Sequence, residues 1–392
     1  MKQDWEIKKL GEVCKVIAGQ SPEGKFYNSG GNGMPFYQGK KEYGEKYIGE
    51  PTTWTTKITK EAEAGDILMS VRAPVGPVNF ATQKICIGRG LAAIRAGKFI
   101  DKEFLFNFFL KHENEIVGNA GAVFNSINKT QIENLKIPLP PLPEQQRIVS
   151  ILDEAFAAID KAKVNAEHNL KNAKELFESY LQGVFEKKGD GWEEKKLGEV
   201  YDVRDGTHDS PKYQNKGYPL VTSKNLKNHK LTLDDVKFIS EADYFNINKR
   251  SKVDVGDVLF AMIGTIGNPV VIEDEPNYAI KNVALFKVGN NQNSYFLKYF
   301  LDSKQTIEKM MRDAKGTTQK FVGLGYLRSF PILLPPLKEQ QTIVRQLDAL
   351  RAETQKLEAV YQKKIADLEE LKKSILQKAF AGELETEKAV AV

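Results

Sequence analysis

The stretch PPLPEQQRIV at residues 140–149 decides the fold of this chain, because it returns as PPLKEQQTIV at residues 335–344. A second pair of similar stretches lies ahead of it, WEIKKLGEV at residues 5–13 and WEEKKLGEV at residues 192–200. Repeats that stack into solenoids have periods of about 20–50 residues, whereas this repeat spans nearly half of the chain. The sequence therefore predicts a duplicated module, an internal repeat with pseudo-two-fold symmetry, that presents two similar surfaces.

The segment after each motif is predicted to be a long helix of fixed length. From the pair Glu144 and Glu339 to the pair Phe185 and Phe380, equivalent residues stay 195 positions apart, so insertions separate the two copies only before the motif. Loops tolerate insertions, whereas helices that pair in register do not. We therefore expect two long helices, at residues 143–188 and 338–382, followed by a C-terminal tail at residues 383–392.

An apolar stripe at spacings of three and four runs along both predicted helices. In the first helix it comprises Ile148, Ile151, Leu152, Ala155, Ile159, Ala162, Ala166, Asn169, Ala173, Leu176, Tyr180 and Val184; in the second it includes Ile343, Leu347, Leu350, Leu357, Tyr361, Leu368, Leu371, Ile375 and Ala379. Such a pattern is typical of a coiled coil. Equal lengths favour an antiparallel pair within the chain, although pairing with another chain or folding back onto the domains remains open.

The segments ahead of the two helices, residues 1–142 and 189–337, are predicted to be α+β domains. Residues 67–71 and 258–263 are apolar runs that follow a Gly-Asp pair and precede a glycine-containing turn, as expected of strands that enter exposed loops. The aromatic runs at residues 104–110 and 295–301 indicate short helices that face a core. A size near 140 residues suits one domain each.

Composition places the chain among folded proteins without a membrane segment. It has 392 residues, a net charge of +5 and a hydrophobic content of 41%. We find no apolar run of the roughly 20 residues that cross a bilayer and no signal peptide at the N-terminus. Since Cys14 and Cys86 both lie in the first copy, no duplicated disulfide framework exists. We therefore expect a cytoplasmic protein with no membrane partner.

The predicted loops of both domains are rich in side chains that can hydrogen-bond to phosphates or to base edges. In the first domain these candidate DNA-binding residues are Gln20, Ser21, Gln38, Lys40, Lys41, Arg72, Lys84 and Arg89. In the second domain they are Arg204, Thr207, His208, Lys212, Tyr213, Ser223, Lys224, Asn225, Thr265, Lys281, Asn282, Lys315, Thr317, Gln319 and Lys320. A single lysine in a loop is usually only solvated, so it is their clustering in both copies that favours nucleic acid.

The sequence offers no catalytic, cofactor-binding or metal-binding motif. Residues 33–41 resemble a phosphate-binding loop only loosely, with one residue too many between the glycines and no Ser or Thr for magnesium. The four histidines show no metal-ligand spacing with each other or with the cysteines. The acidic run at residues 273–275 is interpreted as a surface turn instead of a nuclease site. We therefore expect this chain by itself not to be an enzyme and to hold no cofactor.

The chain has a variable domain, then a Pro-Pro-Leu-x-Glu-Gln-Gln motif with a long helix, and then a second variable domain, motif and helix. This order resembles the specificity subunit of a type I restriction-modification system. The resemblance covers nearly the whole chain and is strongest at residues 137–149 and 332–344. In the second domain it extends to residues 205–208 (Asp-Gly-Thr-His) and 316–319 (Gly-Thr-Thr-Gln). In the first copy Phe124 stands where the second has Gln319, which departs from that pattern.

The resemblance implies that the two domains are target-recognition domains, each reading one half of a bipartite, asymmetric site in double-stranded DNA, with the helices fixing the spacer. It further implies two modification (methyltransferase) subunits that use S-adenosylmethionine to methylate adenine, and restriction subunits that use ATP and Mg. The alternative that we keep open is a coiled-coil scaffold whose domains bind protein partners without DNA.

Overall fold

The computed structural model describes residues 5–113, 126–186, 189–316 and 319–384, and it divides into two compact units. Unit 1 comprises residues 1–166 and 363–392, and unit 2 comprises residues 167–362. Each unit therefore combines one domain with part of both long helices, α4 (Leu142–Glu186) and α10 (Leu337–Ala381). The helices begin at the repeated motif, where the expected spacers begin.

The first domain is built on a four-stranded antiparallel sheet and a second, smaller sheet. The four-stranded sheet has the order β2 (Cys14–Ala18), β10 (Leu91–Ala96), β7 (Ile67–Ser70) and β8 (Val78–Phe80). The smaller sheet has the order β3 (Tyr27–Asn28), β5 (Trp54–Thr55), β4 (Met34–Tyr37), β9 (Ile85–Ile87) and β6 (Glu61–Ala62). Its strands β4 and β9 run parallel. A two-stranded ladder joins β1 (Glu6–Lys9) to β11 (Lys136–Leu139), directly ahead of α4.

The second domain repeats this topology strand for strand in its main sheet. That sheet has the order β13 (Asp202–Asp205), β21 (Val283–Lys287), β18 (Val258–Ala261) and β19 (Gly267–Val271). The smaller sheet has the order β17 (Lys237–Ile239), β14 (Tyr218–Val221) and β20 (Ala279–Ile280), again with a parallel pair, β14 and β20. The ladder of β12 (Glu193–Lys196) with β22 (Pro331–Leu334) precedes α10. The predicted internal repeat of mixed α/β domains is confirmed.

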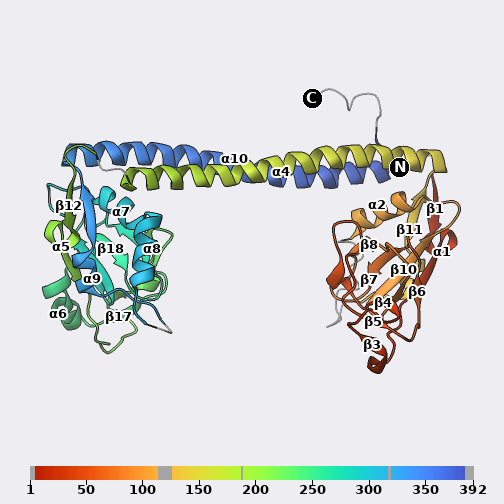
Figure 1. The fold of residues 1–392 in the computed structure, drawn as a ribbon, viewed down its shortest axis with the longest axis horizontal. Helices are drawn as coiled ribbons and strands as arrows, with labels where there is room; N and C mark the ends of the chain where they lie inside the picture. The colour runs from red at the N-terminus through yellow and green to blue at the C-terminus, as the bar shows by residue number, and fades with distance from the viewer. Residues whose placement is uncertain (1–4, 114–125, 187–188, 317–318, 385–392) are drawn as a thin grey trace. The chain divides into compact units, whose positions relative to one another are not determined.

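A helix rich in aromatic residues lies between each main sheet and the long helices (Figure 1). In unit 1 this is α2 (Lys102–His112), whose Phe104 and Phe108 rings lie 4.9 and 5.9 Å from the Phe380 ring of α10. In unit 2 it is α7 (Ser294–Asp302), whose Phe296 and Phe300 rings lie 5.4 and 5.6 Å from Phe185 of α4. Each domain core therefore continues into the long helices. The remaining described helices are short: α1 (Leu10–Val13), α3 (Lys129–Glu133), α5 (Leu197–Val200), α6 (Glu241–Ser251), α8 (Lys304–Asp313) and α9 (Leu324–Ser329).

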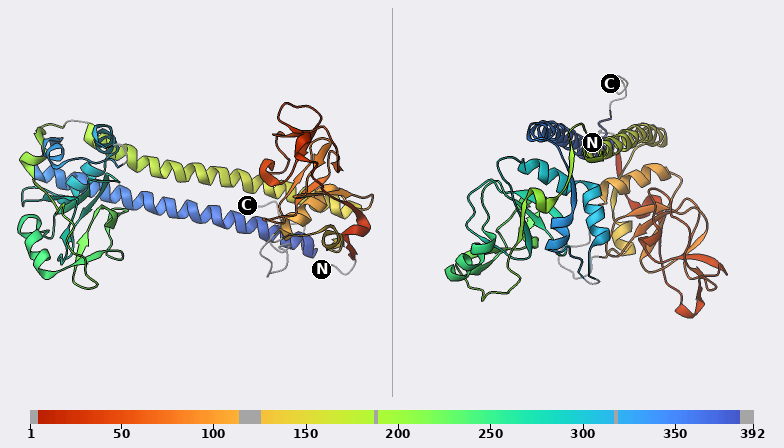
Figure 2. Two further views of the ribbon diagram at one scale, coloured as in Figure 1. Left: turned by 90° about the horizontal axis from the view of Figure 1, so that it is seen from below. Right: turned by 60° about the vertical axis from the view of Figure 1, so that its left-hand side comes forward.

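The two long helices pair as an antiparallel coiled coil, which each unit shows by itself. In unit 1 the first half of α4 pairs with the second half of α10, through ion pairs of Lys163 with Glu369 (2.8 Å) and Asp160 with Lys372 (3.1 Å). In unit 2 the second half of α4 lies along the first half of α10, where Tyr180 Oη donates to Gln346 Oε1 (3.3 Å). The views of Figures 1 and 2 agree on this side-by-side course in each unit.

Burial along α4 corrects the predicted stripe in the second half of the helix. Buried residues recur every seven positions, at Leu152, Ile159, Ala166 and Ala173, as a coiled-coil seam requires. Beyond that point Phe177, Leu181 and Phe185 are buried, whereas the expected Leu176 and Tyr180 are exposed. On α10 the expected Leu357 and Leu371 are likewise exposed. The seam moves on α4 because this half of the helix must face α7 of the second domain as well as α10.

The first glutamine after the motif's glutamate fastens each long helix to its domain. Gln145 is fully buried; its Nε2 donates to the carbonyl oxygens of Phe99 (3.0 Å) and Pro140 (2.8 Å), and its Oε1 accepts from the Asp101 N–H (2.7 Å). Asp101 is the N-cap residue of α2. A buried amide with all of these bonds made stabilises one arrangement of helix and domain.

The second copy repeats this contact. Gln340 Nε2 donates to the Pro335 carbonyl (2.8 Å) and to Gln292 Oε1 (2.9 Å), and its Oε1 accepts from the N–H of Asn293 (3.0 Å), the N-cap residue of α7. The next glutamine in each motif, Gln146 or Gln341, is exposed. The first glutamine of each repeated motif therefore has a structural role, which is to hold the long helix against its domain.

We expect Gln145→Ala to lower the free energy of unfolding by about 1–3 kcal/mol, because the Asp101 N–H and two carbonyls lose their buried partner. Urea denaturation followed by circular dichroism measures the change. Gln146→Ala is the matched control, since an exposed substitution stays within about 0.5 kcal/mol. Equal losses in the two variants would contradict the structural role of Gln145.

Candidate nucleic-acid interface

The parallel strand pair of each domain brings three loops to one edge. In the first domain, Gln20 N–H donates to the Ile87 carbonyl (2.9 Å), and Gly88 N–H donates to the Tyr37 carbonyl (2.8 Å). The loops after β2, β4 and β9 are therefore held together by backbone bonds. The carboxyl ends of parallel neighbours meet at the same edge of a sheet, which suits a binding site.

The second domain builds the same edge from equivalent backbone bonds. Thr207 N–H donates to the Ile280 carbonyl (3.0 Å), and Lys281 N–H donates to the Val221 carbonyl (2.8 Å). Gly206 is required at this approach, because a Cβ there would lie 2.1 Å from the Ile280 oxygen. Gly19 is required in the first domain for the same reason, because a Cβ there would lie 2.1 Å from the Gly88 carbonyl oxygen.

Four of the predicted residues of the first domain gather at its edge. Ser21 Oγ accepts from the Arg89 N–H (3.1 Å), Gln20 lies beside Ser21, and Gln38 follows β4 next to Gly88. Gln20, Gln38 and Arg89 have exposed side chains, so they can meet a ligand. Hydrogen-bonding side chains from three loops therefore converge here.

The other candidates of the first domain lie around that edge or away from it. Arg72 is exposed and follows Val71, whose N–H donates to the Gly90 carbonyl (2.9 Å). Lys40 and Lys41 are exposed in a 3-10 turn directly after Gly39.

Lys84, by contrast, precedes β9 and so lies at the opposite end of that strand from Arg89. It pairs with Glu61 (3.0 Å), and the hydrogen bond that its ammonium donates to that carboxylate raises the pKa of Lys84. The structure does not bring Lys84 into the loop cluster.

In the second domain, Thr207, His208, Ser223, Lys281 and Asn282 come together at the corresponding edge. Ser223 Oγ donates to the Asn282 carbonyl (3.1 Å), and the Asn282 N–H donates to the Thr207 carbonyl (3.2 Å). The Lys281 ammonium donates to Ser210 Oγ (2.5 Å). Asn282 has a φ of 54°, in the left-handed region that asparagine tolerates better than most residues.

His208 is held in place by residues on both sides of its ring. Its Nε2 lies 2.9 Å from Asp205 Oδ2, and its Nδ1 lies 2.8 Å from Asn282 Oδ1. Asp205 is buried, and Arg250 of α6 donates to its Oδ1 (2.8 Å) and to the Gly206 carbonyl (3.0 Å). Arg250 was not predicted from the sequence, because it reaches the site from a helix and lies 45 residues from Asp205 in the chain.

A further loop of the second domain joins this edge through backbone bonds. Gly264 N–H donates to the Lys320 carbonyl (2.9 Å), which brings the exposed Thr265 toward the loop that carries Gln319. A Cβ on Gly264 would lie 3.0 Å from Gln319 Nε2. Lys315, Gln319 and Lys320 are exposed. Thr317 and, in the first domain, Phe124 lie outside the described residues.

Two of the predicted residues have hydrogen-bond partners within the second domain. Asn225 is buried; its Oδ1 accepts from Thr222, and its Nδ2 donates to the carbonyls of Thr232 and Asp235 (both 3.2 Å), so it caps its own turn and has no group left for DNA. Arg204 donates to Asp202 (2.5 Å) and to the Arg250 carbonyl (3.1 Å). The hydrogen bond from Arg204 lowers the pKa of Asp202. Both side chains are already engaged within the domain.

A cavity of about 340 Å³ opens where the loops of the second domain converge. Its polar lining includes Thr222, Ser223, Lys224, Asn225, Lys237, Asn282 and Gln319. Lys237 and the neighbouring Asp235 were not predicted from the sequence. Lys212 and Tyr213 are exposed in the loop after Ser210 and do not line this cavity.

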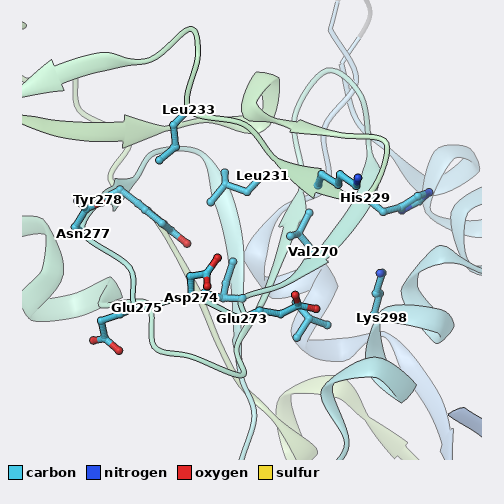
Figure 3. Close-up of a pocket in the computed structure, with 13 residues that line it drawn as sticks. His229, Leu231, Leu233, Val270, Glu273, Asp274, Glu275, Asn277, Tyr278 and Lys298 are labelled. Carbon is cyan, nitrogen blue, oxygen red and sulfur yellow. The ribbon is translucent and has the colours of Figure 1, made fainter. Parts of the chain in front are cut away.

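A second cavity of this domain, of about 530 Å³, has a different character (Figure 3). Figure 3 shows the carboxylates of Glu273, Asp274 and Glu275 along one side, with His229 and Lys298 across from them. An acidic rim repels phosphate, so this cavity does not suit DNA. Among the residues that the structure describes, no group of His, Cys, Asp or Glu could hold a metal ion.

The fold and these loop edges define a DNA specificity protein with two target-recognition domains. The chain belongs to the type I restriction modification DNA specificity domain family, which matches residues 2–168 and 189–367. Within the described part of the chain, none of the helices is both long and apolar enough to cross a membrane.

Similar proteins include two specificity subunits from Methanocaldococcus jannaschii. The chain is 43% identical to the MjaX specificity subunit over 186 residues, which is 46% of this chain and 43% of that relative, so this match spans less than half of either. It is 24% identical to the MjaIX specificity subunit over 420 residues, 98% of this chain and 94% of the relative. A chain from a structural study of type I R-M complex assembly has the same fold, with a TM-score of 0.79 at 22% identity over 98% of this chain and 99% of that one.

We expect Arg89→Ala to weaken duplex-DNA binding by the chain in complex with its methyltransferase and Lys84→Ala to change it little. If Arg89 meets a phosphate, the slope of log affinity against log salt concentration falls by about 0.9. Fluorescence anisotropy over a salt series measures this slope. Equal effects in both variants would contradict the edge defined by the three loops.

Proposed function

We propose that each target-recognition domain reads one half of a bipartite, asymmetric site in double-stranded DNA. The single observation that carries this proposal is the loop edge built twice from the same backbone bonds and furnished with different side chains. Ser21 and Arg89 stand in the first domain where His208 and Asn282 stand in the second. Two edges of one shape and different chemistry suit two different half-sites.

In this proposal, different side chains attract the DNA and recognise its bases. Exposed lysines and arginines supply sequence-independent, salt-dependent attraction to phosphates. Amide and hydroxyl groups at the loop edges then discriminate bases, at about 1–3 kcal/mol for each good bidentate pair. The chain contributes binding and no chemistry, as in specificity subunits generally.

The paired helices set the spacer between the half-sites and dock two modification subunits. Helices α4 and α10 have 45 residues each, and their heptad seam keeps them in register. Exposed apolar side chains outside the seam support docking: Val164 and Leu371 in unit 1, and Leu176, Leu357 and Val360 in unit 2.

The cofactors of the reaction belong to partner subunits in this scheme. The modification subunits use S-adenosylmethionine to methylate an adenine that is flipped out of the duplex. The restriction subunits use ATP and Mg to cut unmodified DNA. The loop edges of this chain determine at which DNA sites the methylation and the cleavage take place.

The proposal is tested by co-expressing the chain with its methyltransferase and mapping adenine methylation across a genome. We expect a bipartite motif with a fixed gap. Replacing residues 1–142 with the first domain of another specificity subunit should change one half of the motif only. Methylation that is independent of this chain, from an active partner, would instead favour the protein-binding scaffold.

The helix spacer is tested by inserting four residues into both helices, after Ala166 and after Gln362. Each helix grows by about 6 Å, so the gap in the methylated motif should lengthen by one or two base pairs while both half-sites stay the same. Four neutral substitutions at the flanking exposed positions provide the control. An unchanged gap, or a change in the half-sites, would count against the spacer role.

A further inference from the structure

The cavity of about 340 Å³ in the second domain contains polar groups of two kinds, those already bonded and those left free. Thr222 donates to Asn225 Oδ1 through both its N–H and its Oγ1, and Ser223 donates to the Asn282 carbonyl. Among the described residues, the Gln319 amide, Asn282 Nδ2 and the lysine ammonium groups of the lining have no hydrogen-bond partner. These free groups are the ones that a ligand meets.

The Gln319 amide is placed so that both of its ends remain available. The side chain is exposed and packs beside Gly264, whose built Cβ would lie 3.0 Å from Gln319 Nε2. Gly264 has a φ of 78°, a conformation that suits glycine, and so it leaves room for the amide. Gln319 therefore offers a donor and an acceptor side by side.

Both ring nitrogens of His208 face oxygen atoms, so Asn282 offers only a donor when the ring carries a proton on each nitrogen. His208 Nδ1 lies 2.8 Å from Asn282 Oδ1, and the other ring nitrogen is fixed by the buried Asp205. Arg250 in turn fixes Asp205. In that form of the ring, the Asn282 amide has its Oδ1 committed to His208 and its Nδ2 free.

We propose that Gln319 reads an adenine in the half-site of the second domain, and that His208 is a positioning residue that holds Asn282 as a donor to a neighbouring base. An amide that donates and accepts in one plane matches adenine N7 and N6 in the major groove, whereas guanine presents two acceptors there. The inference rests on the proposed function and names a base for one of its domains.

The charges around the cavity are consistent with this assignment. Lys224 and Lys237 line it and are exposed, so they can neutralise the phosphates that flank the base. Asp235 is the only carboxylate among the described lining residues, and its backbone carbonyl bonds Asn225. The cavity of Figure 3 differs, since its amide, Asn277, lies among the carboxylates of Glu273, Asp274 and Glu275.

The test uses the full chain co-expressed with its methyltransferase and maps adenine methylation for four variants. Gln319→Ala should lower discrimination at one adenine of one half-site roughly 5- to 150-fold. Gln319→Glu should shift that position toward cytosine, whose N4 donates to a carboxylate. His208→Ala should broaden a neighbouring position and leave Gln319's adenine unchanged. Asn290→Ala is the matched control, since this exposed residue follows the opposite end of β21 from Asn282.

The outcomes separate this inference from the proposed function. Relaxation confined to one position of one half-site supports the role of Gln319, and broadening at a neighbour supports the role of His208. An unchanged motif in Gln319→Ala and Gln319→Glu, or a uniform loss at all sites, overturns base reading while the bipartite motif of the wild type still stands. No methylation with the wild-type chain and an active partner would overturn the proposed function and this inference together.

Discussion

The rest of the structure depends on the buried amides of Gln145 and Gln340. Each joins the first turn of a long helix to the N-cap residue of the aromatic helix beneath it, Asp101 in α2 or Asn293 in α7. Since α2 and α7 belong to the cores of their domains, this contact fixes the angle at which each domain meets its helix. In the proposed function the helices set a distance, which requires a rigid joint. A buried amide with all of its hydrogen bonds made holds one orientation of helix and domain.

Around the joint, Phe380 in unit 1 and the equivalent Phe185 in unit 2 each pack on two rings of the aromatic helix. Phe380 of α10 packs on Phe104 and Phe108 in unit 1, whereas Phe177 and Phe185 of α4 face Tyr299 and Phe296 in unit 2. In unit 2 the Arg351 guanidinium of α10 lies 4.4 Å from the Phe177 ring of α4 and 3.7 Å from Asp302, and in unit 1 the Lys372 ammonium of α10 lies 4.8 Å from the Phe156 ring of α4. Burial is the main cause that raises the pKa of Asp302 and lowers that of His229. Both joints therefore surround the constant amide with a cluster of rings and a cation over a ring.

The sequence predicted the repeat, the long helices and the mixed domains because each has a local signature: a duplicated motif, a seam of spacing three and four, and apolar runs before glycine turns. It could not predict the shift of the seam to Phe177, Leu181 and Phe185, since that depends on α7 packing from far along the chain. Residue type alone also failed for Asn225, which caps its own turn. The parallel pairs β4–β9 and β14–β20 escaped detection because their strands have only two to four residues.

Those short parallel pairs explain how one fold can serve different targets. Their loops are tied by main-chain bonds, from Gln20 to Ile87 and from Thr207 to Ile280, which do not depend on the side chains that project from the edge. The positions with a steric limit are the glycines, Gly19 and Gly206, where a Cβ would meet a carbonyl oxygen. Side chains beside them can change without loss of the backbone bonds. Specificity can therefore change at such an edge while the glycine, the strand pair and the helix joint stay the same.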